Sequence, residues 1–320
     1  ETMKEQVNLP ESFWIILGDS YLQALNSVKA VESFKILVDL YPESLIGRIR
    51  LLGLYEFERK YEQALEYTNA SLRKFENSMQ LMILKANFEL LTGNISSAKE
   101  TVYFLKGKKV NHPLVTRIIA DIALFEKDYA TAVDNFNELY EKKPTALNVM
   151  LLARALKFSG QRNEAAKTLE VYLSGIKKDH KVRMLLAELY MQFDDEKAIR
   201  HLEIINQSEK DNAVVLNNLA MLEMKREKHN RALSYAEKAF DLEPSIYEIL
   251  DTYGMILVNI NDFGTAIPVL ESAVKQGSRA DTTYINLAKA YLGIGEKDKV
   301  KTLILSIDSK EISLKIQKLL

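Results

Sequence analysis

Alanine returns at a nearly constant interval along most of the chain, and this spacing restricts the fold more than any other feature of the sequence. The series is Ala30, Ala64, Ala98, Ala132, Ala165, Ala198, Ala232 and Ala266, with Val300 in the same place at the end. Consecutive members lie 33 or 34 residues apart. A fixed period of this length predicts a stack of similar supersecondary units, each of which buries its apolar face against its neighbours.

Each unit of the repeat reads as two helices joined by a tight turn. The nine units begin near residues 11, 45, 79, 113, 146, 180, 213, 247 and 281. The eighth position of the units is occupied by Gly18, Leu52, Ala86, Ala120, Ala153, Ala187, Ala220, Gly254 and Ala288. Eight of these nine residues are small, as two closely crossing helices require. We therefore predict a helix A, a turn, a helix B and a short connection in every unit, and no sheet.

The first unit carries a fuller pattern than the others. It contains Trp14, Leu17, Gly18, Tyr21, Ala30, Phe34 and Pro42 at fixed offsets. This pattern resembles that of tetratricopeptide-repeat proteins, and the resemblance covers residues 11–308. It implies an all-α fold, a right-handed solenoid of about nine helix-turn-helix units. It also implies a non-catalytic scaffold for protein–protein interactions, whose A helices line a concave groove that binds a peptide or protein segment.

Glycine and proline mark the ends of the expected helices. The turn between helices A and B contains Gly93, Gly160, Gly295 or Asn261. These residues adopt a left-handed backbone conformation at low cost. Pro268 lies inside the eighth helix B, where its ring and its missing N–H disturb a helix. We therefore expect that helix to begin late, around Thr265, or to be kinked.

The two ends of the array are expected to differ. Because the first unit matches the repeat best, we interpret residues 1–10 as the tail of a preceding helix or a linker, with more repeats, a leader or an anchor before it. Residues 309–320 follow the last repeat and place Ile312, Ile316 and Leu319 among charged residues. We predict that they form an amphipathic helix that caps the end of the array.

Composition argues against several classes of function. The chain has 43 basic and 44 acidic residues, so no excess of positive charge favours nucleic acid or an anionic membrane surface. It has no cysteine, which excludes disulfides, thiol catalysis and cysteine-bound zinc. Its four histidines lack ligand spacing, and no phosphate-binding loop or nucleophile elbow is present. We expect no enzyme activity, cofactor, metal site or membrane insertion from this sequence.

Positions 2, 5, 6, 9, 12 and 13 of each helix A are predicted to line the concave groove. A basic group across units four to six consists of Arg117, Arg154, Lys157 and Lys181. A methionine strip across units six to eight consists of Met191, Met221, Met224 and Met255. The other candidates are Asp121, Glu188, Asn217, Asn218, Asp251 and Asn286. The basic group suits an acidic segment, and the flexible methionines suit apolar side chains, so we expect an extended ligand with an acidic part and an apolar part. Self-association of the protein is a further possibility.

Units seven to nine are similar to a narrower group of proteins. The matching stretches are residues 216–220, residues 231–239, Pro244 and residues 250–254. They resemble the C-terminal repeats of bacterial tetratricopeptide-repeat lipoproteins associated with exosortase/PEP-CTERM sorting and exopolysaccharide loci. Met221 and Met255 stand where that family commonly has tryptophan. The resemblance implies a protein of the bacterial cell envelope or periplasm that organises a secretion or polysaccharide system.

Two alternatives stay open at this point. The chain fits the regulatory repeat arm of a larger enzyme, such as a glycosyltransferase or a peptidase, whose catalytic domain lies outside this sequence. A cytoplasmic location is equally compatible with the absence of cysteine, because thiols are kept reduced there and disulfides are rare.

Overall fold

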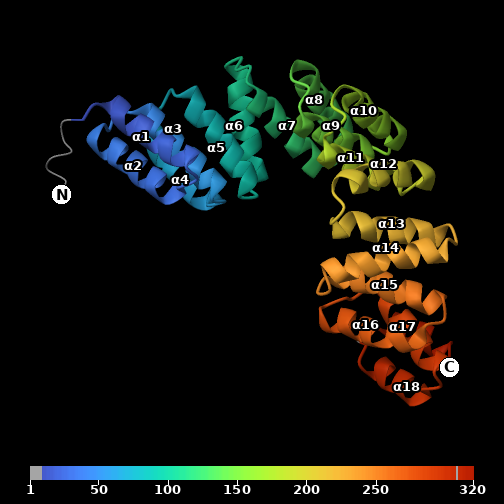
Figure 1. Ribbon diagram of the computed structural model, residues 1–320. Coiled ribbons are helices and arrows are strands. Elements are labelled where there is room, and N and C mark those ends of the chain that lie inside the picture. Colours follow the sequence, from blue (N-terminus) through green and yellow to red (C-terminus); the bar gives the residue numbers. More distant parts are fainter. Residues whose placement is uncertain (1–8, 308) are drawn as a thin grey trace. The chain divides into compact units, whose positions relative to one another are not determined.

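The computed structural model describes residues 9–307 and 309–320, and all regular secondary structure in these residues is α-helical (Figure 1). The described helices are α1 (Glu11–Gln23), α2 (Ser27–Leu40), α3 (Leu45–Phe57), α4 (Tyr61–Leu72), α5 (Met79–Leu91), α6 (Ile95–Gly107), α7 (Pro113–Phe125), α8 (Tyr129–Lys142), α9 (Ala146–Phe158), α10 (Arg162–Gly175), α11 (His180–Tyr190), α12 (Asp195–Ser208), α13 (Ala213–Lys225), α14 (His229–Leu242), α15 (Tyr247–Asn259), α16 (Phe263–Lys275), α17 (Asp281–Gly293), α18 (Lys297–Leu305) and α19 (Lys310–Gln317). The predicted all-α class is confirmed.

The helices alternate as the 34-residue period predicts. The odd-numbered helices from α1 to α17, which we call A helices, begin at residues 11, 45, 79, 113, 146, 180, 213, 247 and 281. The even-numbered helices from α2 to α18 are the B helices. Side chains that accept a hydrogen bond from the first turn fix the start of several A helices, among them Ser44, Asp179 and Asn212. In these repeats the sequence itself therefore encodes the start of the A helix.

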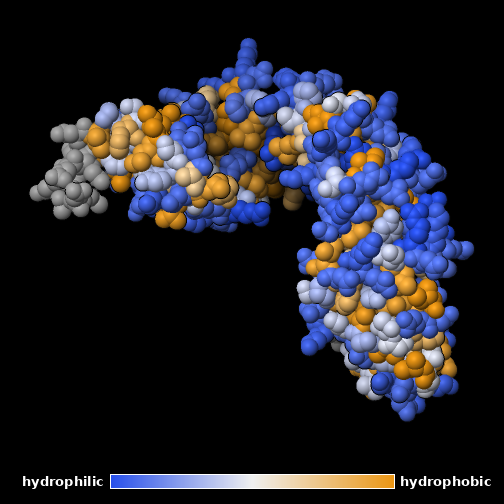
Figure 2. All heavy atoms as spheres, in the orientation of Figure 1, coloured by the Kyte–Doolittle hydropathy of each residue, from blue (hydrophilic) through white to orange (hydrophobic). Residues whose placement is uncertain are grey.

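On a larger scale than the nine repeats, the chain divides into two compact parts. We call these parts unit 1 (residues 1–161, α1 to α9) and unit 2 (residues 162–320, α10 to α19), and we call the nine helix pairs repeats. In unit 1 the A and B helices pack as the pairs α1–α2, α3–α4, α5–α6 and α7–α8. In unit 2 the pairs are α11–α12, α13–α14, α15–α16 and α17–α18. The A helices α13, α15 and α17 also pack against one another in succession. On the face drawn in Figure 2, each unit shows hydrophobic residues interspersed among hydrophilic ones.

Small residues lie where the paired helices cross. Every residue of the alanine series, from Ala30 to Val300, is fully buried. At the eighth position, Gly18 lies against Phe34 and Gly254 against Leu270, so closely that a Cβ at either glycine would overlap the facing side chain. The B helix thus supplies the large side chain and the A helix the small one. Leu52 is fully buried as well, although it departs from this pattern.

Eight of the nine turns between described A and B helices contain a residue in the left-handed conformation, as predicted at four of them; the turn between α11 and α12 has none. Gly93, Gly160, Gly295 and Asn261 have φ values of 79°, 82°, 83° and 62°. Other turns place residues with large side chains in the same conformation, including Leu25 at 56° and Glu227 at 59°. The sequence gives no signal for these residues, because neither is a type that favours positive φ. The packing of the paired helices therefore imposes the left-handed conformation on these residues, at a cost in backbone conformational energy.

The start expected for the eighth helix B is wrong by two residues. Helix α16 begins at Phe263 rather than near Thr265 and contains Pro268 in its interior. Asp262 Oδ1 accepts a hydrogen bond from the Thr265 N–H at 3.3 Å, which fixes the earlier start. The cost of Pro268 is one helical hydrogen bond to the carbonyl of Gly264, and the helix continues to Lys275 despite it.

The C-terminal segment packs on the last repeat of unit 2. Ile312 and Ile316 of α19 are buried in a cluster that includes Leu287 and Val300. The interpretation of residues 1–10 as the end of a preceding element falls mainly on residues 1–8, which lie outside the described residues. Within the described part of the chain, no helix has both the length and the apolar character needed to cross a bilayer.

Candidate functional site

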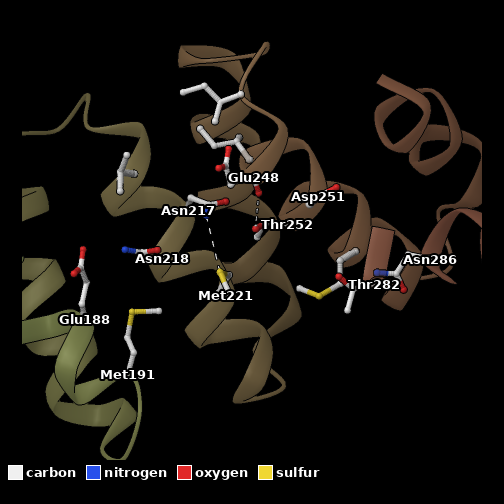
Figure 3. Close-up of a pocket in the computed structure, with 14 residues that line it drawn as sticks. Glu188, Met191, Asn217, Asn218, Met221, Glu248, Asp251, Thr252, Thr282 and Asn286 are labelled. Carbon is white, nitrogen blue, oxygen red and sulfur yellow. Dashed lines mark hydrogen bonds between the residues drawn. The ribbon is translucent and has the colours of Figure 1, made fainter. Parts of the chain in front are cut away.

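A groove of about 850 Å³ runs along the A helices of unit 2 (Figure 3). Its lining comes from α11, α13, α15 and α17 and from the connection before α15. The lining residues are Glu188, Met191, Val214, Asn217, Asn218, Met221, Ile246, Glu248, Ile249, Asp251, Thr252, Met255, Thr282 and Asn286. All of them except Ile246 and Ile249 occupy positions 2, 5, 6, 9 or 12 of their repeats. With 3.6 residues per turn, these positions fall on one face of the helix, and stacking the repeats aligns those faces.

Methionine and branched aliphatic side chains make the apolar part of the groove. Met221 and Met255 come from α13 and α15, Met191 directly follows α11, and Val214 and Ile249 also line the groove. Met221 is 42% exposed, so its side chain has room to change conformation. Methionine has three rotatable bonds and a polarisable sulfur, which lets it fit apolar partners of different shapes.

Two buried asparagines leave hydrogen-bonding groups unused in the groove. Asn217 and Asn286 are each only 8% exposed. The Asn217 amide nitrogen lies 4.0 Å from the Met221 sulfur, a weak contact, and its Oδ1 has no partner. The Asn286 side chain makes no hydrogen bond with the part of the chain that the structure describes. Buried amides are normally satisfied, so the Asn217 amide nitrogen and the Asn286 side chain have capacity for a ligand or for water, whereas Asn217 Oδ1 is itself closed to solvent.

The polar part of the groove is acidic. Glu188 and Glu248 are exposed, Asp251 is half-buried, and the lining contains no lysine, arginine or histidine. Asp251 accepts hydrogen bonds from the hydroxyls of Ser278 and Thr283, each at 2.7 Å. Burial raises the pKa of Asp251; the two hydroxyls oppose this shift, and the nearby Glu248 adds to it. None of the three carboxylates forms an ion pair with a described residue.

The groove contains eight of the fourteen residues predicted to bind a partner. They are Glu188, Met191, Asn217, Asn218, Met221, Asp251, Met255 and Asn286. Met224 is not among the lining residues and instead packs, partly buried, against the core of unit 2. Sequence reasoning missed Val214, Glu248, Thr252 and Thr282, although they occupy the same repeat positions as the predicted residues.

None of the predicted basic group lines this groove. Arg117 and Asp121 of α7 form an ion pair at 3.5 Å, and burial raises the pKa of Asp121 although Arg117 opposes the shift. The Arg154 guanidinium lies 5.6 Å from the centre of the Phe158 ring. These residues and the exposed Lys157 belong to unit 1, whereas Lys181 is an exposed residue of α11 in unit 2. A binding role for the basic group stays a prediction.

Metal ligands do not gather in the described residues. No group of three or more histidine, aspartate or glutamate side chains is placed to hold a metal ion there.

Comparison with known proteins agrees with the repeat architecture. The sequence matches the tetratricopeptide repeat at residues 15–44, 123–189 and 213–246. No curated protein matches the chain. The structure of the C-terminal part of a TPR repeat-containing protein from Cytophaga hutchinsonii aligns with a TM-score of 0.57 and 18% identity, over 72% of this chain and 97% of that one. That likeness shows a shared fold.

Two further solved structures align over shorter stretches. YrrB, described as a TPR protein with an unusual peptide-binding site, gives a TM-score of 0.48 and 17% identity over 58% of this chain and 100% of that one. MamA from Desulfovibrio magneticus RS-1, from residue 41 to its end, gives a TM-score of 0.46 and 16% identity over 51% of this chain and 94% of that one.

Proposed function

Because the chain is a tetratricopeptide-repeat protein, we propose that unit 2 is a non-catalytic binding module that holds an extended peptide segment of a partner protein in its groove. Repeats of this kind are in general scaffolds for protein interactions. The observation that carries the proposal is the pair of buried amides, Asn217 and Asn286, which line the groove with donor groups that make no strong hydrogen bond to a described residue. Peptide main chain offers a donor and an acceptor at every residue and is suited to pair with such amides.

The dimensions of the groove support a peptide ligand. Packed helices lie about 8–10 Å apart, so four successive A helices span on the order of 25–30 Å. An extended chain advances about 3.3 Å per residue and would cover this distance with eight or nine residues. Met191, Met221 and Met255 would contact apolar side chains of the segment, while the asparagines would contact its main chain.

The setting of this interaction is a separate proposal. We propose a bacterial envelope system, on the resemblance of residues 216–254 to the lipoprotein repeats alone. The complete reading frame tests this: a lipid-attachment cysteine upstream supports it. A fused glycosyltransferase or peptidase domain would favour the alternative, a regulatory arm of an enzyme.

Display of random peptides tests the binding function directly. The full chain is immobilised, a displayed library of 12-residue peptides is selected on it, and binders are re-tested on variants. The groove variant carries Asn218→Ala and Met221→Ser, two side chains that reach the groove without being fully buried. The control carries Lys167→Glu on the exposed face of α10, outside the groove.

We expect the groove variant to lose the selected peptides and the control to retain them. Apolar contacts act mainly on dissociation, so the off-rate should rise more than the on-rate falls. Peptides that bind both variants like the wild type, or that fail only on Lys167→Glu, would show that the groove is not the binding surface.

A further inference from the structure

We propose that the groove selects a segment that carries a lysine or arginine among apolar residues, with the cation placed against Asp251, Glu188 or Glu248. This inference rests on the peptide-binding function proposed above and adds the chemical class of the ligand. It also departs from the sequence-based expectation of an acidic segment, since the methionines stand beside carboxylates rather than beside the basic group.

The groove gathers three carboxylates and no cation in its lining. Some carboxylates elsewhere in unit 2 have cationic partners: Asp195 pairs with Lys225 at 2.7 Å, and Glu203 with Arg231 at 2.9 Å. The three groove carboxylates have no such partner among the described residues; Glu248 and Asp251 lie together on α15, and Glu188 lies on α11. Their potentials add, because no cation lies in the lining to neutralise them. An acidic segment would be repelled here, whereas a cationic one would supply the missing charge.

Hydrogen bonds fix the Asp251 carboxylate in a position where it can bind such a partner. The Ser278 hydroxyl donates to Oδ2 and the Thr283 hydroxyl donates to Oδ1, both at 2.7 Å. These two bonds fix the carboxylate on α15, yet each oxygen keeps a further lone pair for another donor. A fixed carboxylate loses little freedom when it binds a cation, which favours association. Half-burial without a cation also disfavours its ionised form, a penalty that a bound ammonium or guanidinium would offset.

The buried amides favour a polypeptide over a free cation as the occupant. Asn217 on α13 and Asn286 on α17 lie on either side of α15, which carries Asp251 and Glu248. Main-chain groups bonded to these two amides would run across α15 and carry a side chain to its carboxylates. Met255 on the same helix offers an apolar surface for the methylene stem of a lysine or arginine.

The experiment uses the 12-residue library peptides that were selected for binding to the immobilised full chain. We expect groove-dependent binders to be enriched in lysine and arginine and depleted in aspartate and glutamate. The most enriched peptide is then synthesised with a fluorescent label, together with a version in which each basic residue is replaced by glutamine. Its affinity is measured by anisotropy at low and high salt, and binding should weaken as salt screens the charges.

Charge-neutral variants locate the carboxylates that matter. Glu188→Gln with Glu248→Gln removes two exposed groove charges without changing side-chain size. Two partly exposed ion pairs contribute together on the order of a tenfold change in dissociation constant, so we expect about tenfold weaker binding of the basic peptide. The glutamine peptide should not distinguish this variant from the wild type. The control, Glu164→Gln with Glu237→Gln, removes two exposed charges of the B helices α10 and α14 and should change binding less than twofold, roughly within measurement error.

The possible failures separate the two proposals. Groove-dependent binders that are neutral or acidic would overturn the selection of a cation and leave the peptide-binding function in place. An equal loss with the groove and control variants would also overturn it, because the effect would then come from net charge. If no binder depends on Asn218 and Met221, the proposed function falls and this inference falls with it.

Discussion

Replacing Gly254 by alanine tests whether small residues are required where an A helix crosses its B helix. A Cβ at this position would lie 2.5 Å from both Cγ and Cδ2 of Leu270, a fully buried side chain. Carbon atoms in contact are normally about 3.5–4.0 Å apart, so about 1 Å of movement is needed. Rotation of the terminal methyl groups cannot supply it, because the overlap includes Cγ. The side chain of Leu270 or the backbone of α16 has to shift.

The change in the free energy of unfolding caused by Gly254→Ala is the sum of two opposing effects. Overpacking a core by one carbon costs about 1–3 kcal/mol, and exchange of glycine for alanine within a helix returns up to about 1 kcal/mol. We expect a net loss of about 1–2 kcal/mol for Gly254→Ala. Gly53→Ala is the matched control, because a Cβ there meets no atom within 4 Å, and it should raise stability by up to about 1 kcal/mol. The two substitutions are chemically identical and should have opposite signs.

Native-state hydrogen exchange is the suitable assay, because repeat arrays need not unfold in a single step. Gly254→Ala should speed exchange in α15 to α17 and leave α1 to α4 unchanged. Leu270→Ala alone should cost about 2–5 kcal/mol, and adding Gly254→Ala to it should cost nothing further, because the shortened side chain leaves room for the new Cβ. If Gly254→Ala stabilises as much as Gly53→Ala does, the steric explanation of the eighth position is wrong.

Three other predictions concern the turns, a half-buried histidine and the groove. Leu25 has a φ of 56° and is 92% exposed, so its replacement by glycine removes backbone strain without loss of packing. We expect Leu25→Gly to stabilise unit 1 by up to about 1 kcal/mol in thermal unfolding. Gly93→Ala, at a φ of 79°, should destabilise unit 1 in the same assay. Burial first, and Arg183 next, lower the pKa of His201, whose Nδ1 lies 3.2 Å from the Arg183 guanidinium, although Glu170 opposes the shift. On acidification, His201 is therefore protonated at a higher pH in the unfolded chain than in the folded one. The free energy of unfolding of unit 2 should fall as the pH drops below about 6.5. His201→Gln should reduce this pH dependence in urea titrations at several pH values. Burial raises the pKa of Asp251, so on acidification this carboxylate should lose its charge at a pH above the ordinary aspartate value of 3.8. A peptide that places a lysine against Asp251 should therefore lose affinity in that pH range. The same peptide with glutamine in place of the lysine should not lose affinity there.

The repeat could be predicted from the sequence because the steric demand on it is strict. The alanine series marks positions at which the side chain has no access to solvent in any of the nine units, so almost only one residue type fits there. The helix starts follow from the same spacing together with capping residues such as Ser44 and Asn212. The left-handed turns at Leu25 and Glu227 could not be predicted, because the packing of two helices imposes them on residues that disfavour them.

The groove could be predicted in position but not in charge. Helical periodicity places Asn217, Met221 and Asp251 on one face whatever lies around them. Whether a charge is available to a ligand depends on contacts that the sequence does not state. Asp121 partly neutralises Arg117, whereas Asp251 meets two hydroxyl groups and no cation. The acidic character of the groove therefore emerges only from the structure.

Stability and recognition are separable on α15, because they use different faces of one helix. Gly254 faces Leu270 of α16, while Asp251, Thr252 and Met255 face the groove. A substitution at Gly254 should change the stability of the repeat without changing which ligand is recognised. A substitution at the exposed Glu248 should change the choice of ligand at almost no cost in stability. Since the period constrains only the first face, residues of the second face are free to differ from repeat to repeat, as Glu188, Met221 and Met255 do at the ninth position of three successive repeats.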